Sequence, residues 1–265
     1  MYAYQNSGDI ERRNNMIKLE HTVLPSPEQM EFIIEGMRNP MNSWDNSDSR
    51  ACLECRDDCS ETSCENNCWD IKNFGLGKND YSLMQLLTNA GTDHRKFMRM
   101  IPVYVRITAP LYWWKEFDTY KVGTVANSCS TMHKIQEKEF TLDDFSHEHL
   151  EHWGEYDHAK YVIDVTIENL NYWREKWLDL DRKIKGKEFS GEESIFSLEK
   201  KQKEFWWQMI QLLPSSYNQT RNVMINYEVL ANIYKSRKSH KLDEWREFCS
   251  WIKTLPYSSL IIKED

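Results

Sequence analysis

The segment LPSSYNQTRNVMINYEVLANIYKSRKSHKLDEWR, residues 213–246, carries most of the information about the fold. Its apolar side chains recur at helical spacing and predict one helix with a stripe toward the core. That stripe consists of Val223, Tyr227, Leu230, Ile233 and Tyr234. Asn226, Asn232 and Arg237 share the helix or its end, although asparagine is a poor helix-interior residue. We interpret the segment as part of a ligand site; buried side-chain hydrogen bonds or an exposed face are the alternative.

Periodicity in the rest of the chain predicts helices around a modest sheet, an α+β fold. Helices are expected over residues 25–37, 159–184, 192–213 and 242–254, with a short one after Asn79. Asn79 or Asp80 is expected to cap that short helix. Residues 103–107 alternate most clearly as a strand, residues 16–24 are strand-like, and 125–134 form a weaker candidate.

The Leu213-Pro214 pair and the polar residues after it resemble the C-terminal region of flavin-dependent thymidylate synthases. That family methylates deoxyuridylate with reduced FAD and methylenetetrahydrofolate. Counted from Pro214 without a gap, its polar positions fall on Asn226, Asn232 and Arg237. The resemblance implies that Asn232 contacts the flavin and that Arg237 is catalytic, binding and polarising the uracil.

A second block, residues 92–121, is similar to the family's flavin-binding region. His94 precedes the strand-like run, and Ala109-Pro110 opens the next helix, as the family pattern requires. The basic triplet of the family falls on Thr119, Tyr120 and Lys121, so only its last basic position is kept. The resemblance implies His94 and Lys121 as further flavin ligands.

Residues 124–131, TVANSCST, correspond to the nucleotide-binding strand of the family. The resemblance implies that Thr124, Asn127 and Ser130 contact the nucleotide. The family's phosphate-binding arginine falls on Thr131 in strict register. Because phosphate recognition needs charge-assisted hydrogen bonds, Lys121, Lys134 and Arg221 are the candidate replacements.

The resemblance also implies a mostly antiparallel central sheet surrounded by long helices, and a homotetramer whose sites are shared between subunits. The chain also resembles proteins encoded in bacterial prophages, which implies a phage or mobile-element origin. Two functions follow as hypotheses. One is a divergent relative that binds, or also methylates, a pyrimidine nucleotide such as deoxyuridylate. The other is a non-catalytic interaction or nucleotide-binding protein that keeps the fold without its flavin and phosphate ligands.

Composition limits the classes of partner and the cellular compartment that we expect for this protein. The formal net charge of −8 argues against non-specific binding to duplex nucleic acid. No run is long and apolar enough to span a bilayer, and residues 1–15 are polar, so we expect a cytoplasmic protein without a membrane partner. We expect a flexible extension over 1–15, followed by a single α+β domain over 16–265 with a Cys-rich insert at 51–69.

Two polar clusters are candidate metal sites. The first consists of Cys52, Cys55, Cys59, Cys64 and Cys68. In a reducing compartment such spacing indicates a structural zinc, with an iron–sulfur cluster or free thiols as alternatives. The second is the segment 146–158, where His149 and His152 would be neighbours on a helix. A solvated polar segment is the alternative for this second cluster.

Overall fold

The computed structural model describes residues 16–51, 74–150, 158–187 and 194–262. The chain divides into two compact units, each built from separate stretches of sequence. The described part of unit 1 covers residue 16 and residues 109–115 and 128–219; unit 2 covers residues 17–108, 116–127 and 220–265, again with the gaps above.

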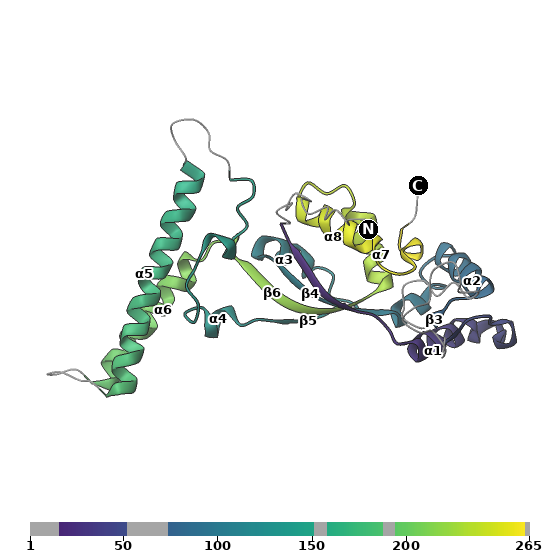
Figure 1. Ribbon diagram of the computed structural model, residues 1–265, viewed down its shortest axis with the longest axis horizontal. Coiled ribbons are helices and arrows are strands. Elements are labelled where there is room, and N and C mark those ends of the chain that lie inside the picture. Colours follow the sequence, from purple (N-terminus) through teal and green to yellow (C-terminus); the bar gives the residue numbers. More distant parts are fainter. Residues whose placement is uncertain (1–15, 52–73, 151–157, 188–193, 263–265) are drawn as a thin grey trace, which may run out of the picture. The chain divides into compact units, whose positions relative to one another are not determined.

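A four-stranded sheet has the order β1-β4-β6-β5 (Figure 1). Its strands are β1 Lys18–Val23, β4 Pro102–Pro110, β5 Val125–Ser128 and β6 Asn218–Asn226. β1 runs antiparallel to β4, with Leu19 opposite Ile107 and Glu20 opposite Arg106. The register shifts between Glu20 and Val23, where His21 adopts a left-handed backbone with φ of 52°.

Strand β4 shows why this sheet has a buried and an open face. Val103, Val105 and Ile107 are buried, whereas Tyr104 and Arg106 between them are exposed. Successive side chains of a strand point to opposite faces, so the apolar set packs inward together. The expected strand over residues 103–107 is confirmed, and α+β is confirmed as the fold class.

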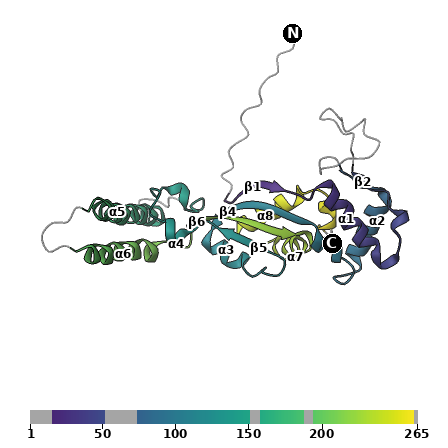
Figure 2. The same cartoon turned by 90° about the horizontal axis from the view of Figure 1, so that it is seen from below.

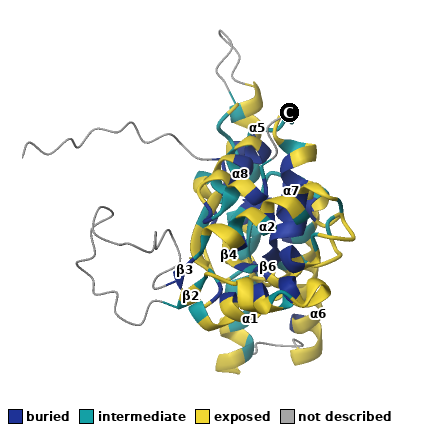
Figure 3. Ribbon diagram, turned by 90° about the vertical axis from the view of Figure 1, so that its right-hand side faces the viewer, coloured by how far each residue is buried: buried dark blue, intermediate teal, exposed yellow. Residues whose placement is uncertain are grey.

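Helices α7 Tyr227–Arg237 and α8 Asp243–Lys253 cover the buried face of the sheet in unit 2 (Figure 1). The buried side of α7 carries Leu230, Ile233 and Tyr234. Figure 3 shows much of α7 in dark blue, the colour of buried residues. α8 buries Trp245, Phe248 and Ile252, spaced as one helical face. The predicted helix over residues 242–254 is therefore confirmed.

One part of the expected helix in the segment 213–246 is wrong. Val223 and Ile225 belong to β6, and α7 begins only at Tyr227. Asn226 stands between the two as the N-cap, with its Oδ1 accepting a hydrogen bond from the Val229 N–H at 3.0 Å. Side-chain capping explains an asparagine here without any ligand.

The N-terminal part of unit 2 holds helix α1 Pro27–Arg38, the two-stranded sheet of β2 Arg50–Ala51 and β3 Phe74–Gly75, and helix α2 Lys78–Asn89. Short 3-10 turns span Asn39–Met41, Trp44–Asn46, Lys96–Met100 and Ser258–Leu260. The expected cap of α2 by Asn79 or Asp80 is wrong, because the N-cap is Gly77, two or three residues earlier.

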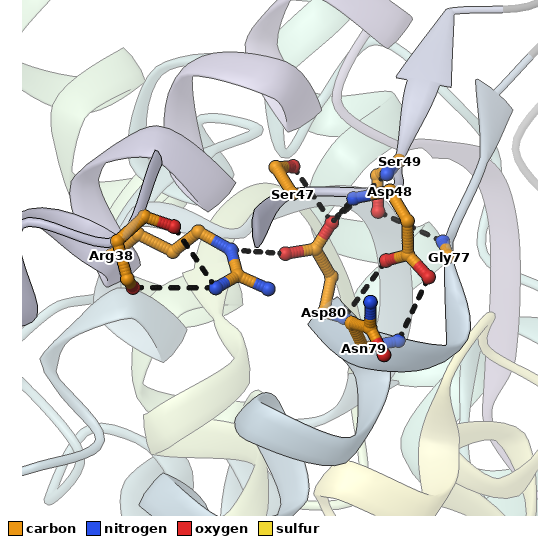
Figure 4. A network of polar contacts seen from close by, with 8 residues as sticks. Arg38, Ser47, Asp48, Ser49, Gly77, Asn79 and Asp80 are labelled. Atoms are coloured by element: carbon orange, nitrogen blue, oxygen red, sulfur yellow. Dashed lines mark hydrogen bonds and ion pairs between the residues drawn. The ribbon is translucent and has the colours of Figure 1, made fainter. Parts of the chain in front are cut away.

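Asp80 instead accepts hydrogen bonds at the centre of a polar network (Figure 4). Its carboxylate accepts from Nε of Arg38 at 2.6 Å, and from Ser47 and the backbone N–H groups of Asp48 and Ser49. Both members of the ion pair are buried. The network therefore fixes the loop between α1 and β2 against the start of α2.

Unit 1 contains the antiparallel pair of helices α5 His158–Gly186 and α6 Ile195–Leu212 (Figure 1). Their interface joins a core formed with the segment before them, comprising Ile135, Phe140, Phe145, Ile163, Leu170 and Met209. Helices α3 Leu111–Phe117 and α4 Thr131–Lys134 and the 3-10 turn Leu142–Asp144 complete the described elements. The two long helices are confirmed, whereas the weak strand candidate over residues 125–134 ends at Ser128 and gives way to α4.

Candidate functional site

Arg237 lies at the C-terminal end of α7, where the helix dipole favours a cation. Its Nε donates to the Tyr120 hydroxyl at 3.0 Å, and its Nη1 donates to Oε2 of Glu116 at 2.7 Å. The same Nη1 lies 2.8 Å from Nε2 of His240. Three side chains therefore orient the guanidinium, and in the described part of the chain Nη2 has no hydrogen-bond partner.

The guanidinium also lies over two aromatic rings. The guanidinium carbon lies 4.8 Å from the ring centroid of Trp245 and 5.8 Å from that of Tyr120. Trp245 is itself fixed, since its indole N–H donates to the same Glu116 oxygen at 2.9 Å. We call Arg237, Glu116, Tyr120, His240 and Trp245 the arginine cluster. Its geometry presents one guanidinium edge in a preset orientation, as recognition of a planar carbonyl compound requires.

The residues expected to hold flavin are placed less favourably. His94 is exposed in a turn, and Lys121 is exposed after α3. Asn232 is exposed on α7 and its Oδ1 accepts from Nη2 of Arg95 at 3.2 Å, so one side of its amide is already used. Arg95 and Arg99 both donate to Glu228, at 3.2 and 2.6 Å. The turn with His94 and the helix with Asn232 do come together, through Arg95.

Two of the three triplet positions serve internal contacts. The Thr119 hydroxyl donates to the backbone carbonyl of Glu116, and the Tyr120 hydroxyl accepts from Arg237. Neither carries the positive charge that a dinucleotide phosphate attracts. Of the three triplet positions, only Lys121 offers a cation to FAD.

The residues expected to contact a nucleotide make different kinds of contact in the structure. Ser130 caps α4 by accepting from the His133 N–H, and it belongs to unit 1. Thr124, Asn127 and Arg221 belong to unit 2. The Thr124 hydroxyl is buried without a hydrogen-bond partner in the described residues, whereas Arg221 donates to Asp118 at 2.7 Å. Lys134 is exposed and pairs with Glu137.

The candidate metal ligands are not brought together in the described residues. The cysteines from Cys52 to Cys68 lie outside the described residues, so the zinc site stays a prediction, which metal analysis of wild type and a Cys52/Cys55 double variant would check. His152 also lies outside them. His149 is in a turn, so it does not have the helical setting that a metal pair with His152 would require, and His147 contacts the backbone carbonyl of Phe145. Within the described ranges no group of three or more His, Cys, Asp or Glu is arranged to bind a metal.

Comparison with solved structures decides the fold. A flavin-dependent thymidylate synthase (ThyX) from Helicobacter pylori, in complex with FAD and dUMP, superposes with a TM-score of 0.51 at 14% identity. The match covers 92% of this chain and 97% of that one. A second structure of the same enzyme, with the same ligands, gives 0.51 at 13% identity, over 92% and 96% of the two chains.

This chain has the fold of flavin-dependent thymidylate synthases. No model of a known protein family matches the sequence, and no curated protein matches it either. The likeness is thus one of structure, at an identity too low to transfer ligands or activity. None of the described helices of this ThyX-like chain has the length and apolarity that crossing a membrane requires.

Sequence reasoning predicted Arg237 but missed the residues that hold it in this ThyX-like fold. Glu116, Tyr120 and Trp245 come from a different helix or loop, and Glu116 lies 121 positions away from Arg237. No local motif marks them, because each reads as an ordinary member of an amphipathic helix or its flank. The only available signal was Tyr120 in the place of a basic triplet residue.

Proposed function

We propose that this chain binds a pyrimidine deoxynucleotide such as deoxyuridylate through Arg237 and has lost the family's flavin site. The observation that carries the proposal is the arginine cluster, which holds a guanidinium edge ready for the carbonyl of a pyrimidine. Nη2 carries two N–H donors, and a hydrogen bond from a charged donor is roughly twice as strong as one between neutral groups. The fold supports the proposal, since the H. pylori enzyme of the same fold is a complex with dUMP.

Glu116 favours binding over methyl transfer. Its carboxylate lies 2.7 Å from Nη1 of Arg237 and partly neutralises the charge that would activate the pyrimidine ring. A recognition role needs only the donor geometry, whereas electrostatic activation needs the uncompensated cation. The proposed function is therefore recognition of the nucleotide, within a homo-oligomer whose subunit number light scattering would establish.

Calorimetric titration with deoxyuridylate tests the proposal. Arg237→Gln is expected to weaken binding at least about ten-fold, because it removes the charged donor. Arg182→Gln is the matched control, since it removes an arginine that is 78% exposed on α5 and that, among the described residues, pairs with Asp179. Equal affinity of wild type and Arg237→Gln would sink the proposal, as would the absence of any binding to wild type.

Methylation of the nucleotide is the second candidate, because Asn232 and Arg237 both lie on α7 in the family's register. Its test is separate from the first. Purified protein that is yellow, takes up FAD and bleaches on reduction, and that then converts deoxyuridylate with methylenetetrahydrofolate, would support it. Colourless protein that binds deoxyuridylate without taking up FAD would leave recognition as the function.

A further inference from the structure

The exposed face of the sheet in unit 2 contains a cavity of about 270 Å³. Figure 2 looks onto this face, which is opposite to α7 and α8. Four strands contribute to its lining: His21, Val23, Tyr104, Val105, Arg106, Val125, Asn127, Asn222, Val223 and Met224. We call this the sheet-face cavity. Its volume lies just below the usual range of small-molecule sites, which suits a small ligand.

His21 enters the cavity from a strained backbone. Its φ of 52° falls at the irregularity of β1, where the pairing with β4 shifts register. A left-handed conformation is costly for a residue with a Cβ, and bulges commonly re-aim a side chain. The strain thus has a visible result, which is an imidazole at the cavity wall instead of a side chain in the regular ladder.

Arg106 is the principal charge of the lining. It extends from β4 on the exposed face, and its guanidinium makes no ion pair or hydrogen bond with any described residue. Glu20 is its cross-strand neighbour in the register, yet no ion pair joins the two, and the lining itself contains no acid. A guanidinium without a partner beside an apolar floor is a site for a planar anion.

The other lining residues suit a heteroaromatic ring. Tyr104 offers an aromatic face and is 49% exposed, and Val23, Val125 and Met224 offer apolar surface. Asn127 and Asn222 each carry an amide donor and acceptor in the side chain, and neither side-chain amide makes a hydrogen bond within the described ranges. Stacking on an aromatic ring with amide contacts at the ring edge is how proteins hold nucleobase-like groups.

We infer that the sheet-face cavity binds a small heteroaromatic anion, with Arg106 on its carboxylate or phosphate and the two amides on its ring edge. This site is distinct from the arginine cluster, because none of the five residues of that cluster lines the cavity. The inference does not depend on the function proposed for Arg237.

The test is a calorimetric titration of the Arg237→Gln variant of the full chain, so that the arginine cluster does not contribute. Three probes distinguish which charged group the cavity recognises. Orotate carries a carboxylate, deoxyuridylate carries a phosphate, and deoxyuridine carries no charge. At least one anion is expected to bind, at least about ten-fold more tightly than deoxyuridine. The tighter of the two anions identifies the charged group that the site takes.

Adding Arg106→Gln to that variant is expected to weaken the anion at least about ten-fold, while adding Arg182→Gln leaves it unchanged. Asn222→Asp, which places a negative charge in the cavity and keeps Arg106, is expected to weaken it as well and serves if Arg106→Gln does not fold. No binding of either anion, or equal binding after these substitutions, overturns the inference. A change of oligomeric state on Arg106→Gln with no anion bound also overturns it, because a second copy of the chain would then cover the face.

Discussion

Nη1 of Arg237 donates to Oε2 of Glu116 across 2.7 Å, and the same carboxylate oxygen accepts from the indole of Trp245. A single acid therefore both neutralises the arginine and positions the ring that covers it. The two side chains are 18% and 36% exposed, so solvent screens the pair and limits its contribution to stability.

Glu116→Gln is expected to tighten deoxyuridylate binding about five-fold, since the neutral amide keeps an acceptor near Arg237 but leaves its charge uncompensated. The free energy of unfolding should fall by no more than about 1 kcal/mol. Calorimetry and urea denaturation measure the two effects. Glu168→Gln, on the exposed side of α5, is the control, and a Glu116→Gln protein that binds more weakly than wild type would contradict the role given to this acid.

Asp80→Asn is expected to destabilise the chain by about 3 kcal/mol or more, because it leaves Arg38 buried without its counter-charge. The amide also loses one acceptor oxygen of a carboxylate that now receives four hydrogen bonds. Urea denaturation followed by tryptophan fluorescence measures the loss. Asp45→Asn changes an exposed acid of the same loop and should stay within about 0.5 kcal/mol of wild type.

The same network predicts an acid-sensitive contribution to stability. Burial raises the pKa of the Asp80 carboxyl, but hydrogen bonds from Ser49, Arg38 and Ser47 and the charge of Arg38 outweigh it and hold the pKa below its usual value. A group with a depressed folded pKa stabilises the protein fully above its unfolded pKa, near 4, and loses that contribution as pH falls further. Melting temperatures from pH 7 to pH 2.5 should therefore fall more steeply below pH 4 for wild type than for Asp80→Asn. Parallel curves would contradict this assignment.

Asn226→Ala is expected to cost about 1 to 2 kcal/mol, because it removes the cap of α7. Asn226→Asp keeps the accepting oxygen and should lose less than Asn226→Ala. Gly123→Ala tests the same contact from the other side. The backbone there has φ of +83°, and a Cβ would lie 2.7 Å from Nδ2 of Asn226. All three variants are compared by thermal unfolding, and an Asn226→Ala protein as stable as wild type would show that the cap is dispensable.

The two described cysteines should differ in reactivity. Burial raises the pKa of the Cys249 thiol to about 11, and thiolate is the reactive form, so this thiol stays inert in the folded protein near pH 8. Cys129 is exposed and should be alkylated under the same conditions. Peptide mapping after treatment with iodoacetamide measures both sites. Alkylation of Cys249 as fast as that of Cys129 would show that α8 opens in the native protein.

Strand and helix signals in the sequence succeeded where the pattern was long and regular. The long helices α5 and α6 and the alternating strand β4 were predicted in place. At residues 223–226 the prediction of helix was wrong, because Val223 and Ile225 also satisfy the two-residue period of a strand. Only the neighbouring strands of the sheet supply the hydrogen bonds that decide between these two readings.

At the candidate site too, the sequence predicted residues that lie close together in the chain but not their remote partners. The register from Pro214 predicted that Asn226, Asn232 and Arg237 would share one segment, and α7 with its cap contains all three. Their partners were beyond prediction, since Arg95 reaches Asn232 and Glu228 from a turn more than a hundred residues earlier. The cavity at Arg106 depends on four strands at once, and no one segment of sequence contains that information.

By itself the sequence determined the α+β class and the faces of the helices, because the amphipathic period depends on residues a few positions apart. Only the tertiary structure decided which charged side chains form ion pairs and which have no partner among the described residues. Glu116 neutralises Arg237, whereas no described acid pairs with Arg106. That difference arises because an ion pair or a cavity depends on distances between side chains remote in sequence, and folding alone sets those distances.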